Sequence, residues 1–155
     1  MAIALTLQRY LDQNFTYGVI PHKPTKSSMR TAETCHISGD CLAKGILLRH
    51  DGGYVLAVLS ASHNVRLPDL RMQLGGDVDL ASEREIAQLF RDCAYGAVPP
   101  VGDCYGLDVI VDDSIEEQPE VYMEGGDHAT LVCMSHAQFA QLTADARHGC
   151  FTAHV

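Results

Sequence analysis

The chain has 155 residues, of which 46% are hydrophobic, so it is long enough for one buried core and too short for two ordinary domains. We therefore predict a single domain over residues 1–155. The net charge of −9 argues against DNA as a partner, because binding a phosphate backbone needs lysine and arginine. No stretch approaches the roughly 20 apolar residues of a membrane span and no basic export signal begins the chain, so we expect a cytoplasmic protein with no membrane partner.

Charge is distributed unevenly along the chain. Residues 1–71 carry a net charge of +3, whereas residues 72–155 carry −12. Two interpretations stay open: the basic residues of the first part form a positive face, or they are spread over a solvated surface. The residues concerned are Lys23, Lys26, Arg30, Lys44, Arg49, Arg66 and Arg71.

The first elements in chain order are short. Apolar residues at helical spacing predict a helix over residues 3–13, and alternation over Phe15–Ile20 predicts a strand that ends at Pro21. After a polar loop, Ser28 or Thr31 is available to cap a short helix that runs to about Ile37.

The middle of the chain gives the clearest pattern. Two apolar runs, 42–49 and 54–59, flank Asp51-Gly52-Gly53 and predict a β-hairpin. A short helix over 67–74 and a short strand over 78–80 follow. Ser82 and Glu85 then fit a capping box at the start of another helix.

Three strands and a helix complete the chain. The strands are predicted at 107–111, 121–123 and 129–134, and the helix from Ser135 to about Ala144. Several strands are joined too tightly for helical crossovers, so the sheet should be mixed rather than parallel. The fold class is therefore α/β, with one mixed sheet and helices.

A stiff loop, Gly96–Gly102, follows the capped helix. Its sequence is Gly-Ala-Val-Pro-Pro-Val-Gly, in which glycine permits unusual backbone geometry and proline fixes φ and removes amide donors. Such a loop can hold a carbonyl or phosphate group with its remaining N–H groups. It can equally be a rigid turn.

Two further segments, at Lys44 and at Gly125–His128, each allow a structural and a functional interpretation. Lys44 lies in an apolar strand, where its ammonium group either faces solvent or lies beside a pocket and contacts a phosphate or carbonyl group. Gly125-Gly126-Asp127-His128 lies between two strands and is either a polar hairpin turn or a close approach to a ligand.

The sequence predicts neither a metal nor a cofactor. The densest cluster of possible ligands, Cys35, His36 and Cys41, has no zinc spacing, and no H-E-x-x-H, G-x-G-x-x-G or P-loop motif occurs. Six cysteines without an export signal are expected to be reduced thiols. A Cys/His nucleophile pair stays open from the sequence, although no G-x-S-x-G nucleophile elbow is present.

Taken together, these segments resemble the YbaK/EbsC-like domain, a family associated with prolyl-tRNA synthetase editing that includes free-standing aminoacyl-tRNA deacylases. The resemblance covers roughly residues 15–143, in family order. Its segments are 44–49, 54–62, 80–83, 90–93, 96–102, 105–107 and 126–131. It implies a barrel-like mixed sheet flanked by helices, and hydrolysis of the ester of a mischarged tRNA, with no cofactor.

The resemblance also implies roles for particular residues. Lys44 matches the family's lysine near the tRNA acceptor end, and Gly96 begins its G-x-x-P loop, whose amides would stabilise the oxyanion. His128 matches a histidine of some alanine-specific members. These three are the predicted catalytic residues. The predicted substrate-binding residues are Gly45, Ala97, Val98, Pro99, Gly102, Gly126 and Asp127.

The resemblance leaves the exact function open. Our first hypothesis is a trans-editing deacylase for tRNA(Pro) or a related tRNA carrying a small wrong amino acid such as alanine or cysteine, with prolyl-tRNA synthetase as a candidate partner. Gly45 replaces the polar side chain that some members place after the lysine. A non-catalytic module that binds tRNA, a nucleotide or a protein is the alternative, and a hydrolase of another small ester or amide is a third.

Overall fold

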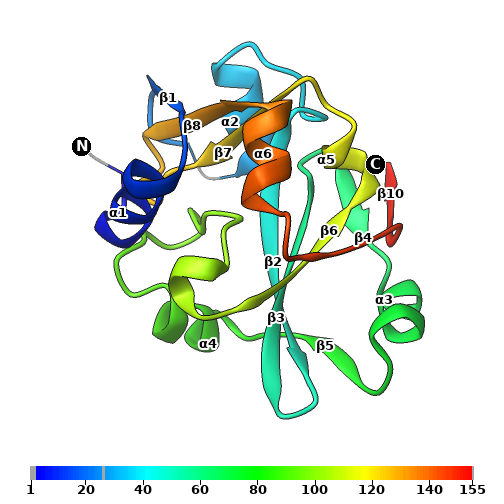
Figure 1. Cartoon of the computed structure of the whole chain (residues 1–155). Helices are drawn as coiled ribbons and strands as arrows, with labels where there is room; N and C mark the ends of the chain where they lie inside the picture. Colours follow the sequence, from blue (N-terminus) through cyan, green and yellow to red (C-terminus); the bar gives the residue numbers. More distant parts are fainter. Residues whose placement is uncertain (1–2, 26, 155) are drawn as a thin grey trace.

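The predicted hairpin forms the centre of the fold. In the computed structural model, which describes residues 3–25 and 27–154, strand β2 (Leu42–His50) pairs antiparallel with β3 (Gly53–Ser60). Figure 1 shows this long hairpin running through the middle of the molecule. Asp51 and Gly52 connect the strands with φ angles of 49° and 77°. Positive φ at both central residues is what a type I′ hairpin turn needs.

The hairpin belongs to a mixed sheet of eight strands, in the order β1-β8-β7-β2-β3-β6-β9, with β5 also paired to β2. The β2–β7, β3–β6 and β6–β9 pairs are parallel and the other pairs are antiparallel, as predicted. The remaining strands are β1 (Gly18–Pro21), β5 (Val78–Leu80), β6 (Asp108–Asp112), β7 (Glu120–Glu124), β8 (Thr130–Ser135) and β9 (Arg147–Gly149). A separate ribbon pairs β4 (His63–Val65) with β10 (Thr152–His154).

Helices cover the sheet. They are α1 (Leu5–Asn14), α2 (Ser28–Thr34), α3 (Leu67–Leu74), α4 (Glu83–Leu89), α5 (Asp113–Glu116) and α6 (His136–Leu142), with a 3₁₀ turn at Asp103–Tyr105. The predicted capping box of α4 is present, with Ser82 and Glu85 each bonding the other's backbone N–H. Within the described part of the chain, no helix is long and apolar enough to cross a membrane.

Both faces of the hairpin are buried. One face packs Ala43, Leu47 and Leu56 into the main core, which also holds side chains from α1, α6 and the segment after α4. The opposite face packs Leu48 and Val55 against α3 and β5. Two-sided burial explains why both strands are continuously apolar. It also means that a polar side chain in β2 stays accessible only near a gap in this packing.

Several element boundaries differ from the sequence prediction. Ser27, not Ser28 or Thr31, caps α2, and the helix ends at Thr34 instead of continuing to Ile37. Strand β1 starts at Gly18 instead of Phe15. Strands β4, β9 and β10 and helix α5 were not predicted; like the predicted strand β5, each has only three or four residues, too few for periodicity alone to identify it.

The basic residues of the first part of the chain do not all form an open positive face. Four arginines lie within 4 Å of a carboxylate: Arg30 of Glu33 at 3.9 Å, Arg49 of Glu85 at 3.8 Å, Arg66 of Asp69 at 3.3 Å and Arg71 of Asp79 at 3.6 Å. Lys26 lies outside the described residues. The structure therefore favours a patchwork of neighbouring charges over a continuous basic surface.

Candidate functional site

The site begins with a gap along one edge of β2. On that edge β2 pairs with β7 only at Leu42 and Ala43, and with β5 only from Leu48 to His50. The backbone oxygens of Cys41 and Leu47 both bond outward across this edge, to the N–H groups of Tyr122 and Ala81. Peptide groups alternate in direction along a strand, so the N–H and C=O groups of Gly45 also point into the gap.

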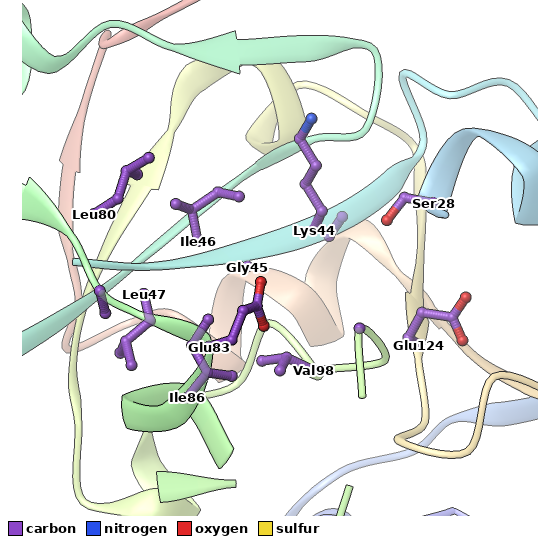
Figure 2. Close-up of a pocket in the computed structure, with 13 residues that line it drawn as sticks. Ser28, Lys44, Gly45, Ile46, Leu47, Leu80, Glu83, Ile86, Val98 and Glu124 are labelled. Carbon is purple, nitrogen blue, oxygen red and sulfur yellow. The ribbon is translucent and has the colours of Figure 1, made fainter. Parts of the chain in front are cut away.

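A cavity of about 270 Å³ occupies this gap. Figure 2 shows it, with Gly45 on the strand and Glu83, Ile86 and Val98 on the same side of the ribbon. The lining residues are Ser28, Ala43, Lys44, Gly45, Ile46, Leu47, Leu80, Ala81, Glu83, Ile86, Gly96, Val98 and Glu124. Four of the ten residues predicted for the site, Lys44, Gly45, Gly96 and Val98, are therefore brought together here.

Lys44 reaches the cavity from the opposite face of β2. Successive side chains of a strand point to opposite faces, so the side chain of Lys44 lies on the other face of β2 from the one that a side chain at Gly45 would occupy. Figure 2 shows Lys44 on the side of the ribbon opposite Val98. Its Nζ donates a hydrogen bond to the backbone oxygen of Ala61 at 3.2 Å. Burial lowers the pKa of Lys44, because leaving water disfavours the charged ammonium group. The ammonium group is therefore held in place and only partly hydrated.

At Gly45, the position of a side chain is already filled. A Cβ there would lie 3.1 Å from Leu56 Cδ1 and 3.3 Å from Pro100 Cα. This position faces the core and the loop after α4, so the contribution of Gly45 to the cavity is its backbone. The close approach of Pro100 also fixes the distance between β2 and that loop.

The predicted loop divides into a cavity part and a buried part. Gly96 and Val98 line the cavity, and their N–H groups have no hydrogen-bond partner among the described residues. Ala97, Pro99 and Gly102 are buried and do not line it.

The buried residues of the loop have structural explanations. The N–H of Ala97 bonds to the oxygen of Ala94 at 3.1 Å. A Cβ on Gly102 would lie 2.5 Å from Val109 Cγ2, so close packing requires glycine at this position. The available donors on the loop are thus Gly96 and Val98.

The Gly125–His128 turn packs against this loop. The Nε2 atom of His128 hydrogen-bonds the backbone oxygen of Tyr95, and the imidazole ring lies 3.4 Å from where a Cβ of Gly96 would be. A carbonyl oxygen only accepts, so Nε2 carries the proton. His128 does not line the cavity. Its contacts are those of a residue that positions the loop.

Gly126 and Asp127 hold the same turn together. The backbone oxygen of Gly126 accepts a hydrogen bond of 2.6 Å from Ala94, which ties the turn to the loop. The Asp127 carboxylate accepts bonds from the Ala129 N–H and the Thr130 hydroxyl group, both at 2.9 Å. Neither residue lines the cavity. Gly126 therefore ties the turn to the loop, and Asp127 stabilises the turn itself.

Glu124 is one of the cavity residues that the sequence did not predict, and it is buried. It is only 5% exposed, and its Oε1 accepts a hydrogen bond of 2.7 Å from the Thr31 hydroxyl group. Its Oε2 has no hydrogen-bond partner among the described residues and lies 3.8 Å from His22 Nε2. Burial raises the pKa of Glu124. The sequence signal for this residue was a glutamate directly before the Gly125-Gly126 pair. A glutamate next to a turn is ordinarily expected to be exposed to solvent, so the signal did not predict a buried carboxylate.

These features define the class of protein: an α/β domain with a small cavity bounded by a lysine, unpaired backbone donors and a buried carboxylate. The sequence model of the aminoacyl-tRNA editing domain matches residues 22–142. The chain belongs to this aminoacyl-tRNA editing family, as the sequence resemblance indicated. A search of curated protein sequences finds no match.

Solved structures share the fold. One, described as a candidate trans-editing enzyme for prolyl tRNA synthetase, has a TM-score of 0.85 and 23% identity, and the match covers 97% of this chain and 96% of that chain. The hypothetical protein APE2540 has a TM-score of 0.84 and 19% identity over 96% and 99% of the two chains. A candidate signal transduction protein from Marinobacter aquaeolei VT8 has a TM-score of 0.77 and 24% identity over 96% of this chain and 30% of that chain. These likenesses confirm the predicted α/β fold with a mixed sheet flanked by helices.

Proposed function

We propose that this protein is a trans-editing deacylase, which hydrolyses the ester between a tRNA and a small, wrongly attached amino acid. Family membership supports an editing function, and the candidate enzyme for prolyl tRNA synthetase among the solved structures points to tRNA(Pro). The single observation that carries the proposal is the cavity of about 270 Å³ at the edge of β2. It suits a small aminoacyl group, with alanine and cysteine as the candidates.

The chemistry needs no protein nucleophile. A water molecule adds to the ester carbonyl carbon, the bond to the ribose oxygen breaks, and that oxygen leaves as a hydroxyl group after taking up a proton. The ester is already activated, and the neighbouring ribose hydroxyl group can assist the water, so positioning and charge stabilisation suffice. The unpaired N–H groups of Gly96 and Val98 are suited to stabilise the negative charge on the carbonyl oxygen.

Charged side chains at the cavity suit the two ends of the substrate. The partly hydrated ammonium group of Lys44 is suited to a phosphate or ribose oxygen at the tRNA acceptor end. An aminoacyl ester also carries a free α-ammonium group, and the carboxylate of Glu124 is suited to accept its hydrogen bond. His128 acts in this proposal through the loop, as a positioning residue.

A panel of mischarged tRNAs tests the proposal. The purified chain is incubated with Ala-tRNA(Pro), Cys-tRNA(Pro) and correctly charged Pro-tRNA(Pro), and release of the amino acid is followed over time. The proposal predicts release of alanine or cysteine well above the spontaneous rate, and little release of proline. Binding of these tRNAs without release would favour the non-catalytic module instead. Prolyl-tRNA synthetase, added in a second series, tests whether it acts as a partner.

A further inference from the structure

The structure brings together three possible metal ligands that are far apart in the sequence. One ligand atom each from Asp40, His63 and His154 lies within 4.8 Å of the other two. They come from the turn before β2 and from the two strands of the β4–β10 ribbon. We propose that Asp40, His63 and His154 form a binding site for a divalent transition metal such as Zn²⁺, separate from the cavity at β2.

The ribbon itself sets the two imidazoles side by side. His63 and His154 are directly opposite each other in the antiparallel register of β4 and β10. Side chains of directly opposite residues project from the same face of the ribbon. Their ring centroids are 5.1 Å apart, with the planes at 73°. This arrangement is produced by backbone pairing, and it lets two nitrogens converge on one point.

The third ligand is already at a suitable distance. His154 Nε2 lies 3.4 Å from Asp40 Oδ1. In a tetrahedral zinc site with bonds of about 2.0–2.1 Å, neighbouring ligand atoms are about 3.3 Å apart. The Ser62 hydroxyl group hydrogen-bonds the same carboxylate and so holds it toward the ribbon. Closing the site thus needs only a modest movement of side chains.

A partly buried hydrogen-bond chain, which ends at the buried Asp112, prepares His63 for a metal. The Thr152 hydroxyl group donates to Asp112 Oδ2 at 2.8 Å, and Asp112 is only 2% exposed. Since that hydroxyl group has a single proton, its oxygen accepts from His63 Nδ1 at 2.9 Å. Nδ1 therefore carries the ring proton, and Nε2 keeps its lone pair. An outer partner that fixes the tautomer in this way is typical of metal-binding histidines.

Two nitrogens and one carboxylate oxygen suit zinc and its neighbours in the transition series. Asp40 and His154 are partly exposed, with 46% and 63% of their side-chain surfaces accessible, so water can complete the coordination. The turn at Ala61 and Ser62 joins this site to Lys44, whose Nζ bonds the Ala61 oxygen. A bound metal would thus brace the turn that holds Lys44.

Titration of the whole chain with Zn²⁺, followed by calorimetry in the presence of a non-thiol reductant, tests the proposal. We expect one ion per chain, a rise of a few degrees in Tm, and an affinity that His154→Gln lowers at least about tenfold. His50→Gln is the matched control, because His50 also lies beside a carboxylate, that of Asp51 at 3.3 Å, but has no third ligand among the described residues. Asp40→Asn, which removes the carboxylate without touching the ribbon, is the second variant.

The chain has six cysteines, so the source of any binding must be identified. Co²⁺ serves as the spectroscopic probe, because thiolate ligands give a strong charge-transfer band and imidazole or carboxylate ligands do not. The proposal predicts a Co²⁺ spectrum without that band. Absence of binding, equal affinity in wild type and His154→Gln, or a thiolate band would each overturn it.

Discussion

Replacing Gly45 by alanine tests whether the spacing between β2 and the 96–102 loop controls the reaction. The new Cβ would lie 3.3 Å from Pro100 Cα and 3.1 Å from Leu56 Cδ1. Ordinary van der Waals contact begins at 3.4 Å, so these distances fall short by about 0.1 Å and 0.3 Å. Leucine can rotate, but the proline backbone must move together with the loop.

The size of the effect follows from these distances. A displacement of 1 Å in a catalytic group can cost about 10²-fold in rate. On this scale the shortfall of about 0.1 Å at Pro100 lowers deacylation about 1.6-fold, and a strand shift by the full 0.3 Å at Leu56 lowers it about fourfold. Overpacking costs about 1–3 kcal/mol, whereas replacing a strand glycine by alanine gains about 0.5–1 kcal/mol. We therefore expect Gly45→Ala to lower the free energy of unfolding by about 1 kcal/mol.

Gly53→Ala is the matched control, because Gly53 also lies in the hairpin and a Cβ there would meet only His50 O, at 3.8 Å. This variant should be as active as wild type and slightly more stable. The assays are single-turnover deacylation of mischarged tRNA, far below the Tm, and urea unfolding. Wild-type rate and stability in Gly45→Ala would refute the reasoning about the loop.

Four further predictions concern the charges and the turn around the cavity. Lys44→Met should lower kcat/KM at least about 100-fold, and unchanged turnover would remove Lys44 from the mechanism. Its free energy of unfolding should be unchanged or up to about 1 kcal/mol higher, because the half-buried ammonium group that it removes is partly desolvated. Glu124→Gln tests the raised pKa of the Glu124 carboxyl group. Because the pKa in the folded state lies above the ordinary value of 4.5, the free energy of unfolding of the wild type should fall as pH rises from 4.5 to the raised pKa. Urea unfolding of the variant should show no such fall. His128→Ala should lower kcat about tenfold with little change in KM, and His128→Gln, which can still donate to Tyr95, should recover part of it; equal rates for both variants would contradict the positioning role. Phosphate contacts by Lys23 and Lys44 alone would make the logarithm of tRNA affinity fall with the logarithm of salt concentration at a slope of about −1.4. A slope steeper than about −4 would indicate a basic surface that includes further residues.

Local patterns in the sequence predicted most of the fold. The hairpin turn at Asp51 and Gly52 and the capping box of Ser82 and Glu85 depend on neighbouring residues, and both are confirmed. The short strands β4, β9 and β10 depend on distant partners, so no local signal marks them. The buried carboxylate of Asp112, which anchors the C-terminal strand through Thr152, is likewise visible only in three dimensions.

The site was predicted less completely for the same reason. Lys44, Gly45, Gly96 and Val98 line one cavity, but the sequence could not separate them from loop residues that only support it, such as Gly102. Glu124 was missed because burial and a missing hydrogen-bond partner are properties of packing. The Asp40, His63 and His154 cluster was missed because sequence spacing reveals a metal site only when its ligands are close in the chain.

The most direct test of the proposed function is a single-turnover comparison of Ala-tRNA(Pro), Cys-tRNA(Pro) and Pro-tRNA(Pro), with the protein in excess and Lys44→Met as the inactive control. The account predicts rapid release of alanine or cysteine, slow release of proline and loss of the rapid phase in the control. Release at the spontaneous rate from all three tRNAs would contradict it.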